Sequence, residues 1–213
     1  MKATLTLFLF VLIGTGSAIF SQTVTIGTQV SIGTQVWMTK NLDVATFRNG
    51  DSIPQVKKDK EWKKAGENQQ PAWCYYNNNQ KNGKKYGKIY NWYAVNDPRG
   101  LAPVGYHIPS DAEWTQLTNY LGGVENAAAK MKNISGWAEN GNGTNSSGFS
   151  GLPGGDRSGN GAFSYVGLNG SWWSSTEYVT FTAWHRSLYY YNGILFRGNN
   201  YRSNGFSVRC LKD

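Results

Sequence analysis

Apolar and polar positions alternate over residues 23–36. The pentapeptide Ile-Gly-Thr-Gln-Val occurs twice, at 26–30 and again at 32–36. β-Branched residues in a period of two are typical of strands. The segment therefore predicts an opening strand or hairpin, after which Trp37 and Met38 are expected to enter the core.

The clearest helix is predicted to begin at Ser110. Ser110 and Glu113 have the spacing of a capping box, in which each side chain satisfies a backbone amide of the first turn. Three apolar residues follow at helical spacing: Trp114, Leu117 and Leu121. Glycines at 122–123 predict the end of this helix, and a second helix is predicted over 124–132.

The remaining segments read as short strands and loops. Residues 49–71 are polar and lysine-rich, which predicts a loop with at most a short helical turn, and 77–83 is a turn-rich connector. Strand-like alternation occupies 73–76 and 86–95, and residues after 132 are rich in Gly, Asn and Ser with regularly placed aromatics. We expect an ordered, loop-rich α+β domain with a twisted antiparallel sheet and two helices.

Near the C-terminus, Asn192-Gly193 is the strongest hairpin signal, because a type I′ turn needs positive φ at both positions. This two-residue turn would pair Leu188 with Arg197. Side chains alternate across a strand, so the pairing sorts the residues into two faces. One face carries Trp184, Arg186, Leu188, Tyr190, Leu195 and Arg197. The other face carries His185, Ser187, Tyr189, Tyr191, Ile194, Phe196 and Gly198.

Neither face of this hairpin is plainly polar, whereas a surface sheet usually alternates apolar and polar positions. Either both faces are buried, or the second face is an exposed aromatic patch of the kind that marks binding sites. Tyrosine supplies large, rigid contact area, and Asn, Ser and Gly supply adaptable polar contacts. This composition favours recognition of a protein or cell-surface ligand.

Composition and charge change this picture little. Aromatic residues make up 15% of the chain and charged residues 16%, and the net charge is +8. Five lysines cluster in 57–64, which indicates either a solvated segment or a patch for an anionic partner. No arginine stripe or nucleic-acid motif accompanies them, so we expect no nucleic-acid partner.

The N-terminus has the pattern of a secretory signal peptide. A lysine at position 2 precedes an apolar run over 3–13 and small residues at 14–18. Residues 1–21 are predicted to be the signal peptide, with cleavage after Ala18 or just before Gln22, and residues 22–213 the exported domain. We expect no transmembrane segment in the mature chain, and the sequence leaves its oligomeric state open.

Candidate chemistry is sparse. Cys74 and Cys210 are the two cysteines, and in an exported chain one disulfide between them is an open alternative. Two cysteines and two histidines give a zinc cluster little to work with, so we expect no metal and no cofactor. A structural calcium at Asp97 and Asp156, with their Asn neighbours, is the open alternative. His107 is expected to make a structural hydrogen bond, and His185 has only Glu177 as a nearby carboxylate. The chain is therefore predicted not to be an enzyme.

Four ordered motifs carry a family resemblance. They lie at 32–42, 86–92, 105–114 and 205–210. Together they resemble the Fibrobacter succinogenes major paralogous domain. The resemblance implies an exported bacterial protein with a C-type-lectin-like fold, which formylglycine-generating enzymes share. The chemistry of those enzymes depends on active-site cysteines, whereas both cysteines here fall in strand-like segments of different regions.

The resemblance further implies a diversified region. Some proteins with this fold are variable proteins of diversity-generating retroelements, and residues 171–213 look like such a region, with scattered residues in a constant-looking frame. The candidate ligand-binding residues are Tyr178, Phe181, His185, Ser187, Tyr189, Tyr191, Ile194, Phe196, Gly198 and Tyr201. The alternatives are a structural cell-surface protein without a specific ligand and a formylglycine-generating-like enzyme.

Overall fold

The computed structural model describes residues 29–213 of the 213-residue chain. The predicted signal peptide, residues 1–21, lies outside the described residues, as do the first residues of the predicted 22–213 domain. Within the described part, no helix combines the length and apolar character needed to span a membrane.

The described chain begins with the expected hairpin. β1 (Gln29–Ile32) pairs antiparallel with β2 (Gln35–Met38), and Gly33 supplies a φ of +64° in the turn. β2 then pairs with β12 (Leu211–Lys212), which pairs with β5 (Tyr106–His107). The two ends of the described chain are thus joined in one four-stranded sheet of order β1-β2-β12-β5.

The second sheet has eight strands in the order β10-β9-β8-β6-β11-β4-β3, with β7 paired to β6. Its strands are β3 (Trp73–Cys74), β4 (Ile89–Asn91), β6 (Gly154–Arg157), β7 (Phe163–Val166), β8 (Asn169–Val179), β9 (Thr182–Tyr189), β10 (Leu195–Tyr201) and β11 (Gly205–Phe206). The pairing is antiparallel except between β6 and β8. The predicted α+β class is confirmed.

Both predicted helices are present. α4 (Asp111–Tyr120) begins at a capping box, in which the Glu113 amide donates to Ser110 Oγ at 3.3 Å and the Ser110 amide donates to Glu113 Oε2 at 2.7 Å. α5 (Val124–Met131) follows after two glycines with positive φ. Trp114 and Leu117 are fully buried, as their helical spacing predicts.

The count of two helices was wrong. The described residues also contain α1 (Asp59–Glu67), α2 (Gln80–Tyr86), α3 (Trp92–Val95) and a 3₁₀ turn at Tyr76–Asn78. These helices are short, and their stability comes from tertiary contacts: Trp62 of α1 is buried and its Nε1 donates to the carbonyl of Ser203 at 3.0 Å. Of the three buried residues of α1, Trp62, Ala65 and Gly66, only Trp62 has a large apolar side chain, so the apolar stripe that would predict this helix is weak.

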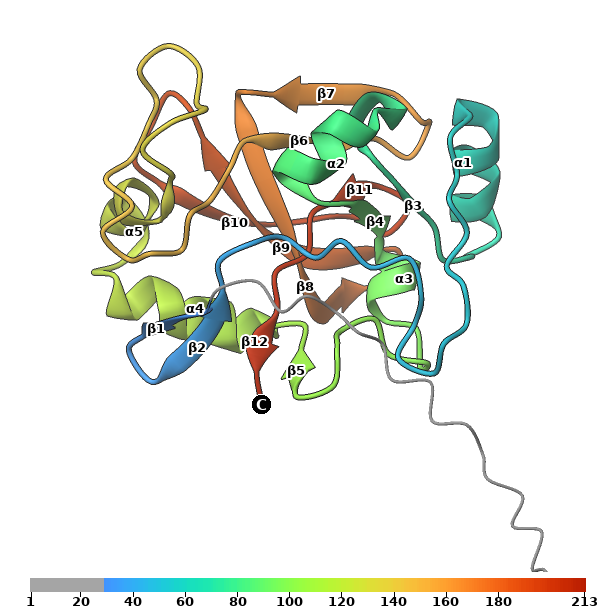
Figure 1. Cartoon of the computed structure of the whole chain (residues 1–213), viewed down its shortest axis with the longest axis horizontal. Coiled ribbons are helices and arrows are strands. Elements are labelled where there is room, and N and C mark those ends of the chain that lie inside the picture. The colour runs from blue at the N-terminus through green and yellow to red at the C-terminus, as the bar shows by residue number, and fades with distance from the viewer. Residues whose placement is uncertain (1–28) are drawn as a thin grey trace, which may run out of the picture.

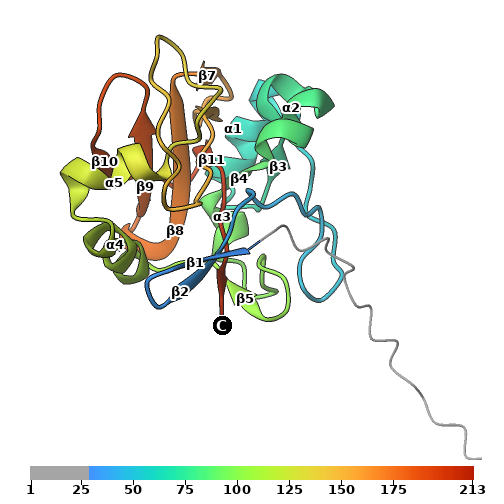
Figure 2. The same ribbon diagram turned by 60° about the vertical axis from the view of Figure 1, so that its left-hand side comes forward.

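The large sheet has core packed on both faces. Trp172 and Trp173 are adjacent on β8, so their side chains point to opposite faces. Trp172 joins the cluster of Trp37, Trp114 and Phe149 beneath α4 and α5, whereas Trp173 joins the cluster that contains Phe206. Figures 1 and 2 show α1 and α2 away from α4 and α5.

Candidate functional site

The C-terminal hairpin consists of β9 and β10, with β10 at the edge of the large sheet. Leu188 pairs with Leu195, and His185 pairs with Gly198. The predicted turn would have paired Leu188 with Arg197. The predicted register was therefore wrong by two residues, and the strands are joined by a longer loop, residues 190–194.

Tertiary contacts override the predicted turn. Neither Asn192 nor Gly193 adopts a positive φ, so no type I′ turn forms there. Instead, the buried Lys132 at the end of α5 donates from Nζ to the carbonyl oxygens of Tyr189 at 3.1 Å and Asn192 at 2.9 Å. The amide of Tyr190 also donates to the carbonyl of Leu168 at 2.9 Å. The loop is held open against α5.

A shift of two residues leaves the face assignment unchanged, because side chains alternate with a period of two. Leu188 and Leu195 are buried under α5 on the face predicted to be core. Arg186 is also buried there, while Trp184 is half-buried and Arg197 is exposed.

The structure divides the ten candidate ligand-binding residues by burial. Six are exposed: Tyr178, Phe181, Tyr191, Ile194, Phe196 and Tyr201. Tyr189 is half-buried. The expectation of an exposed position was wrong for His185, Ser187 and Gly198, which are buried. On this part of the face the alternative that both sides of the hairpin are buried is the correct one.

His185 is buried because core residues from distant segments cover it. Its ring centroid lies 6.2 Å from that of Trp173 and 5.0 Å from that of Phe206. Burial and, to a smaller extent, the charge of Arg186 lower the pKa of His185 to about 4, against the opposing effect of a backbone hydrogen bond to Gly198. Its Nδ1 has no hydrogen-bond partner within residues 29–213. At neutral pH the ring is an uncharged part of the core.

Gly198 is buried under an aromatic ring of its own strand. A Cβ on Gly198 would lie 2.3 Å from Cε1 of Phe196, so the glycine leaves the space that this ring fills. The Phe196 ring also lies 6.0 Å from His185 and 6.1 Å from Tyr189, and Tyr189 lies 5.6 Å from Tyr191. We call Tyr189, Tyr191 and Phe196 the loop-end cluster.

A second aromatic pair lies at the opposite end of the hairpin. Phe181, in the β8–β9 turn, and Tyr201, at the end of β10, line a groove of about 530 Å³ together with Tyr93. Polar side chains complete the groove, among them Lys63, Gln69, Asn160 and Ser203. A concave site of this size is within the range that holds small ligands. We call Phe181 and Tyr201 the turn-end pair.

An ion-pair network that the sequence did not predict fixes the hairpin on α4. The Asp111 carboxylate accepts from Arg186 Nη1 at 2.7 Å and from Arg197 Nη2 at 2.7 Å. The Arg197 guanidinium also lies 3.5 Å from the ring centroid of Trp184, and the Tyr178 ring meets that ring edge-on, with the centroids 4.6 Å apart. Because 75 residues separate Asp111 from Arg186, no local pattern could have indicated this contact.

The disulfide left open by the sequence is not formed. Cys74 and Cys210 are both free and buried, in different core clusters. Burial raises the pKa of each thiol to about 12, against the opposing charges of nearby arginines, so neither side chain is a reactive thiolate near neutral pH.

His107 makes the structural hydrogen bonds that were expected. Its Nδ1 lies 2.7 Å from Asp213 Oδ1 and its Nε2 lies 2.9 Å from Glu113 Oε1, so it joins the C-terminal residue to α4. Glu177, the carboxylate considered for His185, pairs with Arg202 instead. Among residues 29–213 no group of three or more His, Cys, Asp or Glu side chains is placed to hold a metal.

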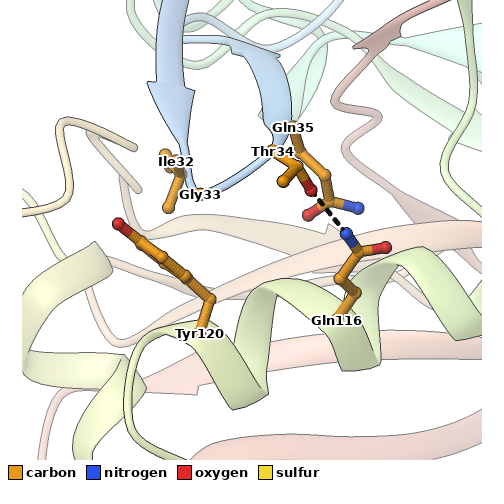
Figure 3. A pocket seen from close by; sticks show the side chains of 6 residues that line it. All are labelled: Ile32, Gly33, Thr34, Gln35, Gln116 and Tyr120. Atoms are coloured by element: carbon orange, nitrogen blue, oxygen red, sulfur yellow. Dashed lines mark hydrogen bonds between the residues drawn. The ribbon is translucent and has the colours of Figure 1, made fainter.

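A shallow pocket of about 330 Å³ lies between the β1–β2 turn and α4 (Figure 3). Gln116 Nε2 donates to Thr34 Oγ1 at 2.8 Å, and a Cβ on Gly33 would lie 2.9 Å from the Tyr120 ring. None of the ten candidate residues lines this pocket, which marks the contact that holds the first hairpin on α4.

Fold and surface together define an α+β domain that displays aromatic side chains on an edge hairpin. The chain belongs to the family of the Fibrobacter succinogenes major domain, whose family model matches residues 30–212. The resemblance predicted from the four motifs is confirmed. Neither a curated protein nor a solved structure matches the chain. The C-type-lectin-like fold stays a prediction.

Proposed function

We propose that this protein is an exported, non-enzymatic binding module that recognises a protein or cell-surface partner through its C-terminal hairpin. One observation carries the proposal. Thirteen large hydrophobic side chains are exposed in the described chain, and seven of them belong to residues 171–213. Apolar side chains that are contiguous on the surface indicate an interaction site, and the rings of Tyr191 and Phe196 lie 5.6 and 6.1 Å from that of Tyr189.

The surface is anchored in a way that suits recognition. Lys132, at the end of α5, fixes carbonyl groups at the loop end of the hairpin, and Asp111, at the start of α4, fixes two of its arginines. A pre-organised surface loses less conformational entropy on binding than a flexible loop does. Aromatic side chains with few rotatable bonds add contact area at the same low entropic cost.

The buried cysteines support a non-enzymatic role. A thiol whose pKa is raised to about 12 carries almost no thiolate near neutral pH, and each of the two is enclosed in a different core cluster. The arrangement gives no support to the alternative of a formylglycine-generating-like enzyme.

We keep the hypothesis of retroelement diversification, but only for the exposed candidate residues. Diversification would fall on the exposed candidates, because substitutions at the buried His185, Ser187 and Gly198 would alter the core. The test is to compare the locus between sister strains. A coding segment for 171–213 that is identical in all of them, with no neighbouring template repeat or reverse transcriptase, would exclude diversification.

The binding proposal is tested with two matched triple variants, each of which replaces exposed apolar side chains by serine. The site variant changes residues that are 64–67% exposed: Phe181, Tyr191 and Tyr201. The control variant changes residues outside the hairpin that are 64–76% exposed: Val104, Tyr120 and Ile134. Both should remain folded, which the urea midpoint checks: the changed side chains are exposed, and the control loses only the packing of Tyr120 on Gly33.

The readout is capture of partners from cell-surface fractions on the immobilised protein. We expect the site variant to lose the captured partner and the control variant to retain it. If both variants capture the partner as the wild type does, the hairpin is not the binding surface. If the folded wild type captures nothing, the alternative of a structural surface protein is favoured.

A further inference from the structure

We propose that α1 and α2 form a docking face for an anionic lipid surface, separate from the loop-end cluster. The segment from Lys57 to Tyr86 contains eight lysines and three carboxylates, a net charge of +5. The rest of the chain, without Lys2, contains twelve basic and ten acidic residues, a net charge of +2. Most of the protein's positive charge is therefore concentrated on two short helices and their flanks.

Two lysines of this segment and one arginine outside it are paired with the carboxylates of the segment. Lys58 lies 3.1 Å from Glu61, Lys63 lies 3.7 Å from Glu67, and the buried Arg157 lies 3.0 Å from Asp59. These pairs use all three carboxylates of the segment. Six exposed lysines have no ion pair within residues 29–213: Lys57, Lys60, Lys64, Lys81, Lys84 and Lys85.

Each helix arranges its lysines in the same way. Lysines stand at positions i, i+3 and i+4 in both: 60, 63 and 64 in α1, and 81, 84 and 85 in α2. This spacing puts the three lysines on one side of each helix. They lie opposite the buried Trp62 in α1 and opposite the buried Gly83 and Tyr86 in α2. Like charges at this spacing destabilise a helix, so the pattern is not explained by helix stability.

A hydrogen bond joins the residues that precede the two helices. Asn78, just before α2, donates from Nδ2 to the carbonyl of Lys57, just before α1, at 2.9 Å. Figures 1 and 2 both show α1 and α2 away from α4 and α5. The loop at 190–194 is bound to Lys132 at the end of α5, away from α1 and α2. A membrane bound to the lysines would therefore leave the exposed Tyr191 accessible to a partner.

The chemistry of the face favours lipid headgroups over nucleic acid. Between residues 57 and 86 no large hydrophobic side chain is exposed, whereas single-strand nucleic-acid binding adds aromatic stacking. The free cations are all lysines, which act as point charges, and base recognition relies on the bidentate geometry of arginine. Clusters of four to eight basic residues are attracted to anionic membranes, each lysine adding to the binding.

The test measures co-sedimentation of the purified chain with lipid vesicles at low ionic strength. One set of vesicles is phosphatidylcholine alone, and in the other a third of the lipid is phosphatidylglycerol. The neutral vesicles report any contribution from the apolar residues 3–13. We expect binding to the anionic vesicles only, and a loss of that binding as salt is raised, because salt screens exposed charges.

Two charge-matched double variants locate the face. The face variant is Lys60→Gln with Lys84→Gln, and the control is Lys40→Gln with Lys212→Gln, both of which are exposed and lie outside the two helices. Glutamine has a helix propensity close to that of lysine, so both variants should unfold at the wild-type urea midpoint. We expect the face variant to bind roughly 30-fold more weakly and the control to change less than about two-fold.

Three results would overturn the proposal. The first is equal binding to neutral and anionic vesicles, and the second is an equal loss in the face and control variants. The third is tighter binding to a DNA duplex or to heparin than to the anionic vesicles, which would assign the lysines to a soluble polyanion. None of these outcomes bears on the aromatic hairpin, so the two proposals fail independently.

Discussion

Removal of the Asp111 charge should destabilise the protein far more than removal of its exposed partner. Asp111 is 14% exposed and pairs with Arg186, which is 1% exposed. Asp111→Asn leaves the Arg186 guanidinium buried beside a neutral amide. Loss of one partner of a buried ion pair typically costs about 3–5 kcal/mol. Because Asn can still accept a hydrogen bond, we expect a loss near the lower limit, about 3 kcal/mol in the free energy of unfolding.

The matched control is Arg197→Gln. Arg197 is 45% exposed and shares the same carboxylate, but Arg186 continues to neutralise Asp111 when Arg197 is changed. An exposed ion pair contributes at most about 1 kcal/mol. Urea unfolding followed by tryptophan fluorescence measures both variants, and linear extrapolation gives the free energies. Equal losses in the two variants, or a loss below about 1 kcal/mol in Asp111→Asn, would refute this account of the network.

The pH dependence gives the same prediction a second measurement. Burial alone would raise the pKa of Asp111, but its hydrogen bonds and charge contacts with Arg197 and Arg186 lower the pKa below the ordinary value of an aspartate. A lowered pKa means stability that is present above the unfolded value of about 3.9 and is lost as pH falls through the folded value. The difference between wild type and Asp111→Asn should therefore shrink in acid.

Two further predictions concern His107 and the cysteines. Burial opposes charging of His107, but the carboxylates of Asp213 and Glu113 raise its pKa. Its contribution to stability should therefore be complete below about pH 6.5 and be lost as pH rises through the folded pKa. His107→Gln should remove this decline, which the urea midpoints at pH 5.5 and pH 9 measure. Cys74 and Cys210 should resist a maleimide reagent in the native protein and both react in urea, because they are free and buried. Mass spectrometry should then show two added labels per chain in urea without a reducing agent. A chain that gains no label under these conditions would indicate a disulfide.

Local features of the fold were predictable from the sequence. The capping box at Ser110 and the helix that follows it depend on contacts between neighbours three and four residues apart. The turn at Gly33 between two short alternating runs likewise depends on local backbone geometry. By contrast, α1 depends on tertiary contacts such as the one between Trp62 and Ser203, which is 141 residues away.

The candidate site was only partly predictable. Alternation fixed which residues of the hairpin share a face, and this assignment tolerates a register shift of two. It could not show that Phe206 and Trp173 close over His185, because those contacts come from other strands. It also could not show that Phe196 folds onto Gly198, because nothing in the pattern reports ring orientation.

By itself, the sequence determined the family, the α+β class, the principal helix and the two faces of the hairpin. These depend on periodicity and on neighbouring residues, which a linear chain displays directly. Only the tertiary structure decided the hairpin register, through Lys132, and the anchoring of its strands, through Asp111. It alone decided which aromatic residues reach solvent, because burial depends on what the distant parts of the chain place over each side chain.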